Sequence, residues 1–226
     1  MPCCGGKDPA DLNSFGLNKH RVMKLIILGE AGVGKTSLLF RFVGHEFPER
    51  VESTIAIDFK ILEIGIDDED FKVQMWDTSG QERFHSLTRQ FYNAADAVVL
   101  VYSERKRSTL AQLEHFWVKE IKKYSIPAKH VLIIGNQNDR LRKDKPMIED
   151  DELRRICSGF RTTIAHMSAK KDSAQHCQDV IDNFCQDVLM YKYQLAGPIE
   201  STSGSSEAPV APDLEGFHHV RLEDDD

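Results

Sequence analysis

GEAGVGKT, which runs from Gly29 to Thr36, is the stretch that decides the fold of this chain. It fits the pattern Gly-x-x-x-x-Gly-Lys-[Ser/Thr] and directly follows the apolar run from Val22 to Leu28. Glycines let successive backbone N–H groups turn inward around phosphate oxygens, and a helix that begins there adds the positive end of its dipole. The sequence therefore predicts a strand, a phosphate-binding loop and a helix, in that order.

Two side chains carry the chemistry of this loop. We expect the Lys35 ammonium to reach the β- and γ-phosphates of a nucleotide and the Thr36 hydroxyl to ligate Mg²⁺. The other residues expected to contact the nucleotide here are Gly29, Ala31, Gly32, Val33, Gly34 and Ser37. A glycine-rich turn without a ligand is the alternative, but the amphipathic run from Thr36 to Phe42 predicts the helix that a phosphate loop requires.

Further apolar runs predict the rest of a sheet. Val22 to Leu28, Ala97 to Tyr102 and Val131 to Gly135 are rich in β-branched residues without polar alternation, which is typical of parallel strands buried on both faces. A last strand is expected from Thr162 to Met167. Because strands of this kind alternate with helical segments, the pattern predicts a doubly wound sheet with its ligands at the carboxyl ends of the strands.

One hairpin is expected at the edge of this sheet. Ile55 to Ile64 alternates apolar and polar residues, and the acidic turn Asp67 to Asp70 leads back into Phe71 to Trp76. Helices are expected from Ser108 to Lys123 and from Asp172 to Tyr193, with a weaker pattern from Ser86 to Asn93. The predicted fold is an α/β P-loop NTPase, a six-stranded and mostly parallel sheet with helices on both faces.

Composition divides the chain into three parts. Residues 1–19 and 196–226 are rich in Gly, Pro, Ser and Asp and lack apolar periodicity, so we expect a flexible N-terminal segment and a disordered acidic tail around a domain at residues 20–195. From Ala196 onward the tail holds eight acidic residues and one Arg, which accounts for the whole net charge of −7. The rest is nearly neutral, so its charge does not support nucleic-acid binding. The tail is either a solvated end or a docking site.

Cysteine usage and hydropathy indicate the compartment. The five cysteines have neither metal nor disulfide spacing, which fits a reducing environment. The sequence contains neither a long apolar run for a membrane span nor the pattern of a signal peptide. We therefore expect a cytoplasmic protein, or one held on the cytosolic face of a membrane.

Residues for γ-phosphate and metal chemistry lie in two further segments. WDTSGQE, from Trp76 to Glu82, follows a predicted strand. At the end of that strand Asp77 can hold Mg²⁺ through water, the Gly80 N–H can bond a γ-phosphate oxygen, and Gln81 can orient an attacking water. Thr54 follows Lys35 by nineteen residues, where a loop can bring its hydroxyl to Mg²⁺. The expected metal ligands are thus Thr36, Thr54 and Asp77, and the expected catalytic residues are Gln81, Lys35, Thr54 and Gly80.

Two more segments select the base. NQND follows the strand that ends at Gly135, and SAK follows the last predicted strand. The Asp139 carboxylate can accept hydrogen bonds from N1–H and the 2-amino group of guanine, whereas adenine offers neither donor in that arrangement. The residues expected to bind the base are Asn136, Gln137, Asp139, Ser168, Ala169 and Lys170. The cofactors expected are therefore GTP and GDP with Mg²⁺.

From about Arg21 to Tyr193 the chain resembles a Ras-superfamily small GTPase, and among these the Rab branch. The Rab-like stretches are STIAIDF from Ser53, KVQMWDTSGQERF from Lys72 and FYNAA from Phe91. The resemblance implies a molecular switch in vesicle or membrane traffic that hydrolyses GTP to GDP. It also implies that effectors, an exchange factor and a GTPase-activating protein bind through the loops of Thr54 and Gln81.

The resemblance assigns roles to four aromatic residues. Phe59, Trp76 and Phe91 would form a surface set that effectors recognise. Phe47 would lie edge-on against the guanine base, and a plain core phenylalanine is its alternative. No arginine occupies an obvious position to stabilise the transition state, so an activating protein is expected to supply that charge.

Several positions depart from the family pattern. Gln137 stands where a lysine is usual, which predicts lower guanine affinity, and Ala31 and Ala56 replace other small residues. The last cysteine is Cys185, so no prenylation is expected. Cys3 and Cys4 are instead candidates for S-acylation, or remain unmodified in a disordered end.

Two other functions compete with the switch. A scaffold with a Rab fold would bind nucleotide weakly or hold it without turnover, as Gln137 and the missing lipid tail suggest. A P-loop ATPase or kinase conflicts with Asp139 and Ala169. Intact Lys35 and Gln81 favour the switch.

Overall fold

A six-stranded sheet runs through the part of the chain that the structure describes. The computed structural model describes residues 22–48, 57–66, 69–78, 92, 95–123, 130–140 and 148–196. The sheet has the order β2-β3-β1-β4-β5-β6. Its strands are β1 (Val22–Leu28), β2 (Ile57–Ile66), β3 (Glu69–Thr78), β4 (Ala97–Ser103), β5 (His130–Asn136) and β6 (Arg161–His166).

Strand β1 lies in the middle and carries the phosphate loop at its carboxyl end. It pairs in parallel with β3, where Ile27 lies beside Asp77, and with β4, where Leu28 lies beside Leu100. Of the paired strands, β2 and β3 alone are antiparallel in the described sheet. The predicted antiparallel edge and parallel core are therefore confirmed.

The turn between β2 and β3 is shorter than predicted. Glu69 and Asp70 belong to β3, where they pair with Ile66 and Gly65. Asp70 is exposed, so a carboxylate at this end of the hairpin keeps its hydration and does not oppose strand pairing. Clustered acidic residues alone were a poor guide to where the turn ends.

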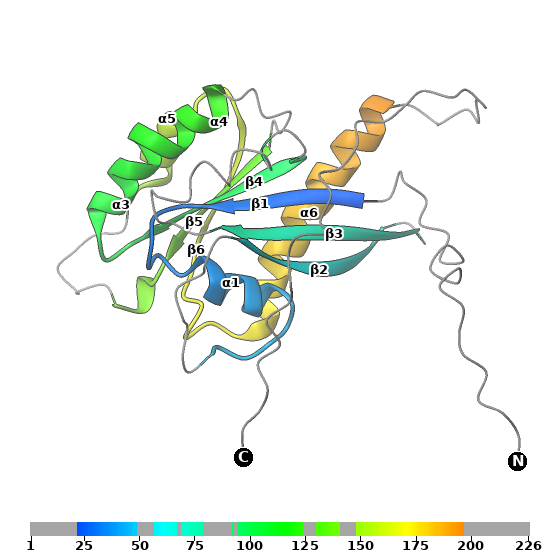
Figure 1. Ribbon diagram of the computed structural model, residues 1–226, viewed down its shortest axis with the longest axis horizontal. Helices are drawn as coiled ribbons and strands as arrows, with labels where there is room; N and C mark the ends of the chain where they lie inside the picture. The colour runs from blue at the N-terminus through cyan, green and yellow to red at the C-terminus, as the bar shows by residue number, and fades with distance from the viewer. Residues whose placement is uncertain are drawn as a thin grey trace, which may run out of the picture.

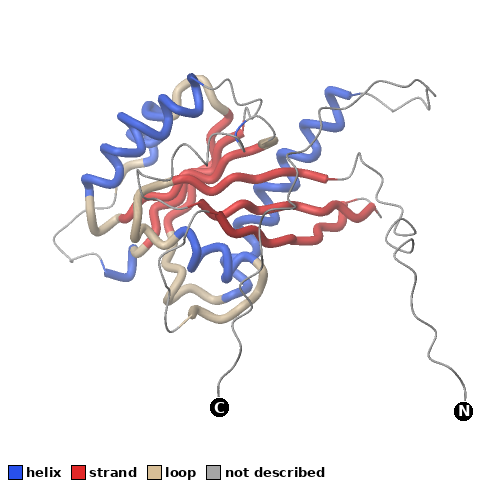
Figure 2. Tube along the Cα trace, viewed as in Figure 1, coloured by secondary structure: helices blue, strands red, loops and turns tan. Residues whose placement is uncertain are grey.

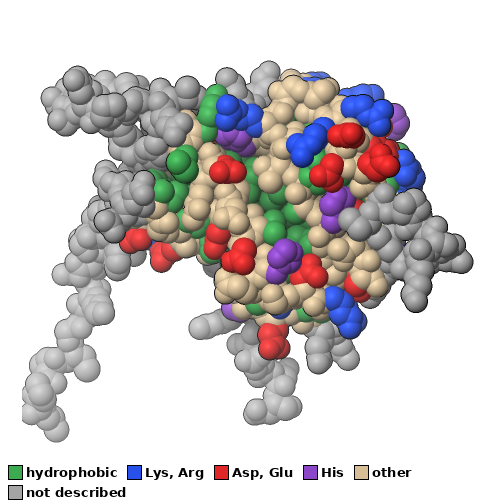
Figure 3. Space-filling model, turned by 180° about the vertical axis from the view of Figure 1, so that it is seen from behind, with side chains coloured by type: hydrophobic (Ala, Val, Ile, Leu, Met, Phe, Trp, Pro, Cys, Tyr) green, Lys and Arg blue, Asp and Glu red, His purple; other side chains and the backbone are tan. Residues whose placement is uncertain are grey.

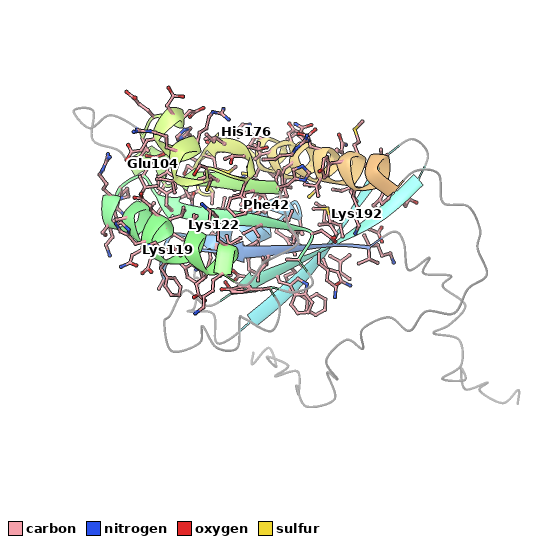
Figure 4. All side chains as sticks on the ribbon, turned by 90° about the horizontal axis from the view of Figure 1, so that it is seen from above. Phe42, Glu104, Lys119, Lys122, His176 and Lys192 are labelled. Carbon is pink, nitrogen blue, oxygen red and sulfur yellow. The ribbon has the colours of Figure 1, made fainter. Side chains whose placement is uncertain are left out.

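Each face of the sheet packs against its own set of helices (Figures 1 and 2). Helices α1 (Lys35–Phe42) and α6 (Ala174–Ala196) cover one face. The other face is covered by α3 (Arg107–Gln112), η4 (Leu113–Trp117), α4 (Val118–Lys123) and α5 (Asp150–Ile156). Strands β4 and β5 are buried along their whole length, because successive side chains enter opposite cores. Figure 4 shows Phe42, a fully buried residue at the end of α1, near the centre of the molecule.

The predicted helix from Ser108 to Lys123 contains a π-helical turn. It runs as α3, η4 and α4, and the five residues of η4 form the wider π turn. Phe116 and Trp117 are neighbours in sequence, yet both pack against the same core cluster, with ring centroids 5.0 Å apart. Both rings lie in the π turn, where successive residues are rotated by less than the 100° of a regular α-helix.

Other boundaries differ by a few residues from the predicted ones. Helix α6 begins at Ala174 and extends to Ala196, and the short helix η5 (Asn138–Arg140) follows β5. Helix α5 was not predicted. Of the weak segment from Ser86 to Asn93, Tyr92 alone is described, and it is helical and buried. Residues 1–19 and the tail from Gly197 lie outside the described residues, so their predicted disorder stays a prediction.

Candidate functional site

The phosphate loop follows β1, and three of its glycines have positive φ, two of which also leave no room for a side chain. Gly29 has φ 148° and Gly34 has φ 95°, both in the region that L side chains rarely adopt. A Cβ on Gly29 would collide with the Val101 carbonyl, and a Cβ on Gly34 would collide with the Asn136 amide. The loop therefore packs directly against the ends of β4 and β5.

Lys35 lies within this loop rather than on the surface. Its Nζ donates hydrogen bonds to the carbonyls of Gly29 at 2.9 Å and Glu30 at 3.0 Å, and the residue is 6% exposed. Burial lowers the pKa of Lys35 to about 8, against the opposing attraction of Asp77 and Glu30. A phosphate beside this ammonium would offset its desolvation.

Thr36 and Asp77, two of the expected metal ligands, lie in contact. The Thr36 hydroxyl donates to Oδ2 of Asp77 across 2.6 Å. The Thr78 hydroxyl bonds the Ile27 carbonyl at 2.7 Å, which fixes the end of β3 beside β1. A hydroxyl and a carboxylate are hard oxygen ligands, so this pair fits Mg²⁺. The described residues contain no His, Cys, Asp and Glu cluster of the kind that transition metals occupy.

The segments predicted to bind the base converge on one pocket beside the phosphate loop. NQND begins at Asn136, the last residue of β5, and SAK comes after β6, which lies next to β5 in the sheet. The pocket is lined by Gly34, Ser37, Phe47, Asn136, Gln137, Asp139, Ser168, Ala169 and Lys170. All of these residues were predicted nucleotide contacts.

Asn136 connects the three parts of the site. Its Nδ2 donates to the Val33 carbonyl of the phosphate loop at 2.8 Å, and its Oδ1 accepts a hydrogen bond from the Ala169 N–H at 3.1 Å. Ser168 holds Asp139 through a hydroxyl-to-carboxylate bond of 2.6 Å. The phosphate loop, NQND and SAK thus form one hydrogen-bonded unit.

Gln137 bridges the phosphate loop and the end of β4. Its Nε2 donates to the Gly32 carbonyl at 3.1 Å, and its Oε1 accepts a bond from the Ser103 hydroxyl at 2.7 Å. It is the one non-glycine residue with positive φ, 65°, in the described chain. The sequence marked Gln137 as a departure but gave no sign of Ser103, because β4 and NQND are distant in sequence.

Phe47 and Lys170 lie together at the pocket. The Lys170 ammonium is 6.0 Å from the centroid of the Phe47 ring. Phe47 is half-buried, lines the pocket and also packs against the core of α1 and α6. Its position agrees with both readings, a ring beside the base and a core residue.

At the edge of the sheet, Phe59 of β2 stacks on Trp76 of β3, with ring centroids 5.3 Å apart. Phe59 is 44% exposed. Two members of the predicted aromatic set are therefore adjacent. Its third member, Phe91, and the expected catalytic residues Thr54, Gly80 and Gln81 lie outside the described residues.

A polar cluster beside the base pocket, which sequence patterns did not predict, is formed by Tyr102, Glu104, Asp150 and His166. Its members come from β4 and the loop after it, α5 and β6, without any motif spacing. Only the strand order brings them together.

The fold and the site define a P-loop nucleotide-binding protein. The chain belongs to the Ras family, whose family model matches residues 24–189. It is therefore a small GTPase, which binds GTP or GDP and hydrolyses GTP to GDP.

Similar proteins include several Rab proteins. The chain is 35% identical over 152 residues to Ras-related protein Rab-1 of Theileria annulata, 67% of this chain and 68% of that protein. It is 35% identical over 167 residues to Ras-related protein Rab-18-B of Danio rerio, 73% and 80%. It is 32% identical over 193 residues to Ras-related protein Rab-13 of Rattus norvegicus, 85% and 90%. The Rab-like resemblance is thus confirmed.

Proposed function

We propose that this GTPase is a Mg·GTP-dependent switch in vesicle or membrane traffic. The observation that carries the proposal is the position of Asn136, which joins the phosphate loop to both base-recognition segments. A site built in this way senses base and phosphates together. The similarity to Rab proteins supports a role in membrane traffic.

Different residues of the site would bind the phosphates, the base and the metal ion. Lys35, already directed into the phosphate loop, would exchange its bonds to backbone carbonyls for the β- and γ-phosphates. Asp139, held by Ser168, would accept the two donors of guanine. Thr36 and Asp77, with Thr54, would hold Mg²⁺, which neutralises charge on the phosphates when it is bound.

Hydrolysis and switching would depend on the two loops of Thr54 and Gln81. Gln81 would orient the attacking water, and the Gly80 N–H would bond the γ-phosphate. Loss of that phosphate would release both loops, so effectors would distinguish the two states. Phe59 and Trp76 would form part of the surface that effectors contact. An arginine from an activating protein would accelerate hydrolysis by about 10³ to 10⁵.

The first test is the nucleotide that accompanies the purified protein. It is released by denaturation and identified by chromatography. One GDP per protein molecule is the expected result, since a tight and hydrolysing site retains its product. Retained GTP, or an empty site, would contradict turnover and favour the scaffold.

A second test addresses the base. Asp139→Asn places an amide where the carboxylate would accept two donors, so it should weaken GDP binding by more than tenfold and improve binding of xanthosine diphosphate, which carries a carbonyl at position 2. Equal affinity of the variant and the wild type for GDP would contradict the role of Asp139.

Membrane attachment is proposed at the N-terminal cysteines. No helix in the described ranges has the length and hydropathy to cross a bilayer. We propose that the protein is cytoplasmic, or peripheral on a membrane's cytosolic face through S-acylation of Cys3 and Cys4, without prenylation. A Cys3→Ser, Cys4→Ser double variant should move to the soluble fraction. If it fractionated like the wild type, the acylation proposal would fail.

A further inference from the structure

A buried polar cluster lies beside the base pocket. The Glu104 carboxylate accepts a hydrogen bond from the Tyr102 hydroxyl at 2.6 Å, and its same oxygen, Oε1, lies 2.8 Å from His166 Nδ1. His166 Nε2 lies 3.0 Å from Oδ1 of Asp150, the first residue of α5. Figure 4 shows Glu104 at the end of the molecule where α3 and α5 lie.

Glu104 is an unusual residue for its position. Its side chain is 0% exposed, and its Oε2 has no hydrogen-bond partner among the residues that the structure describes. The carboxylate is packed so closely on Gly135 that a Cβ there would collide with it. A buried carboxylate in this setting needs a nearby positive charge, because desolvation penalises it strongly.

His166 is the group that can supply that charge. Both of its ring nitrogens face carboxylate oxygens, and only the doubly protonated imidazolium can donate to both. The hydrogen bond to Glu104 raises the pKa of His166, the bond to Asp150 adds to this, and burial opposes it. The ring is 17% exposed, so protons can reach it from solvent.

Other charged groups near the cluster are paired with one another. Arg107 of α3 binds Glu152 at 2.7 Å, and Arg154 lies 4.0 Å from Asp150, both on α5. Tyr102 donates to Glu104 and stays neutral, because burial and the neighbouring Glu104 raise its pKa. The net charge of the cluster therefore changes when His166 gains or loses a proton.

The cluster connects to the loops that hold the base. The Glu104 N–H donates to the Asn136 carbonyl at 2.9 Å, and the residue after His166, Met167, donates from its N–H to the Gly135 carbonyl at 2.9 Å. Met167 also accepts a bond from the Asn138 N–H at 3.4 Å. The Glu104–His166 pair thus connects the end of β5, where NQND begins, to the end of β6, which precedes SAK.

We propose that the Glu104–His166 ion pair positions the NQND and SAK loops around guanine, so that nucleotide is released faster when His166 loses its proton. This inference rests on the proposed guanine site. It makes His166 a positioning residue, which acts through the backbones of Asn136 and Met167 rather than by contact with the nucleotide. Release should accelerate as pH rises, because a histidine with a raised pKa contributes its interaction below that value and loses it above.

The test measures release of a fluorescent GDP analogue with excess GDP and Mg²⁺ from pH 6 to pH 9. Wild-type release should accelerate about tenfold across this range, as expected for the loss of a charged hydrogen bond. His166→Gln and Glu104→Gln should both release at the fast rate at every pH. His115→Gln, at an exposed histidine on η4, is the matched control and should keep the wild-type profile.

The variants separate this mechanism from others. Burial also lowers the pKa of Lys35, so a pH dependence that persists unchanged in His166→Gln would belong to the phosphate loop and would overturn the proposal. A variant with reduced thermal stability but the wild-type pH profile would assign the pair a merely structural role, which also overturns it.

Nuclear magnetic resonance of the wild-type protein provides a test that does not depend on whether the variants fold. The His166 ring should titrate with a midpoint that matches the midpoint of the release profile. A clear mismatch, or pH-independent release by a wild type that binds GDP, would refute this inference and leave the guanine site standing. A wild type without affinity for GDP would refute both.

Discussion

The Gln137 side chain bridges two parts of the site, although its backbone has an unfavourable conformation. Its positive φ costs about 1 kcal/mol or more in a non-glycine residue, yet its amide satisfies both Gly32 and Ser103. The amide therefore compensates for the unfavourable backbone. Gln137 fixes one edge of the pocket in place of the lysine that the family pattern would put there.

Removal of that amide should loosen nucleotide binding. Gln137→Ala retains the unfavourable positive φ but loses both hydrogen bonds. We therefore expect GDP affinity to fall by about 1 to 2 kcal/mol, or roughly 5- to 30-fold. Ser103→Ala removes one bond of the two and should fall between this variant and the wild type. Calorimetric titration with GDP measures both, and equal affinities would exclude a bridging role.

Gly135 is constrained by close packing of neighbouring side chains and not by an unfavourable backbone conformation. A Cβ there would collide with Glu104 and lie 2.6 Å from the Tyr102 hydroxyl. Gly135→Ala should therefore lower the free energy of unfolding by about 1 to 3 kcal/mol, as overpacking does. Gly65→Ala is the control, since a Cβ there meets only Asp70 at 3.9 Å. Chemical denaturation measures the difference, and similar stabilities would mean that Glu104 moves aside freely.

The predicted binding residues within the described ranges were found where motif spacing placed them. Lys35 begins the helix after β1, Asn136 ends β5 and Asp139 lies in the short helix after it, and the carboxyl ends of parallel strands meet at one edge. Glu104 and His166 could not be predicted. Their contact depends on β4, β5 and β6 being neighbours, which no local pattern encodes.

At the scale of elements, the strands were easier to predict than the helices. β4 and β5 are continuous apolar runs because both of their faces are buried. Helix α5 buries Leu153 alone within its span, so it lacks an apolar stripe. Its acidic first turn and its arginines near the end favour a helix through the dipole, a weaker signal that the prediction overlooked.

Within the π turn η4, we expect Trp117 to contribute more to the free energy of unfolding than its neighbour Phe116. Trp117 is fully buried against the sheet, while its neighbour Phe116 is half-buried. Trp117→Ala should lower the free energy of unfolding by about 3 to 5 kcal/mol, and Phe116→Ala by less. Unfolding followed by circular dichroism tests this, because fluorescence would lose one of its two tryptophans. Equal effects would mean that the π turn does not favour either ring.

The molecule as a whole should be stabilised by the nucleotide it binds. GDP at about a thousand times its dissociation constant adds about 4 kcal/mol to the free energy of unfolding, which corresponds to a rise in Tm of about 8 to 16 °C for a domain of this size. ATP at the same concentration should leave the Tm nearly unchanged. A comparable rise with ATP would revive the ATPase alternative.

The far end of the sheet from the base pocket should respond to acid. His130 at the start of β5 packs edge-on against Tyr191 of α6, with ring centroids 4.7 Å apart. Burial lowers the pKa of His130, Arg161 lowers it further, and Asp187 opposes both. The folded state thus favours neutral His130, so its contribution to stability is present above about pH 6.5 and lost as pH falls.

His130→Gln should therefore flatten the loss of stability between pH 7 and pH 5, where one proton accounts for up to about 1.4 kcal/mol per pH unit. The measurement is denaturant unfolding at each pH. His115→Gln should retain the wild-type slope, and a similar slope in His130→Gln would assign acid sensitivity to carboxylates instead.

The surface of the molecule agrees with the charge pattern of the sequence. On the face shown in Figure 3, acidic and basic side chains are interspersed rather than gathered by sign. This distribution fits the nearly neutral domain expected from the sequence and adds no support for nucleic-acid binding.

The strand order also determines when this protein can become functional during its synthesis. The phosphate loop is made early, but the amide that fixes its Val33 carbonyl belongs to Asn136, 103 residues later, and Ala169 comes later still. The apolar β1 strand, whose neighbours β3 and β4 follow it in the chain, leaves the ribosome before its partners exist. The apolar β1 strand therefore stays without its pairing partners until much of the domain has emerged, a period in which an unpaired strand is prone to aggregation.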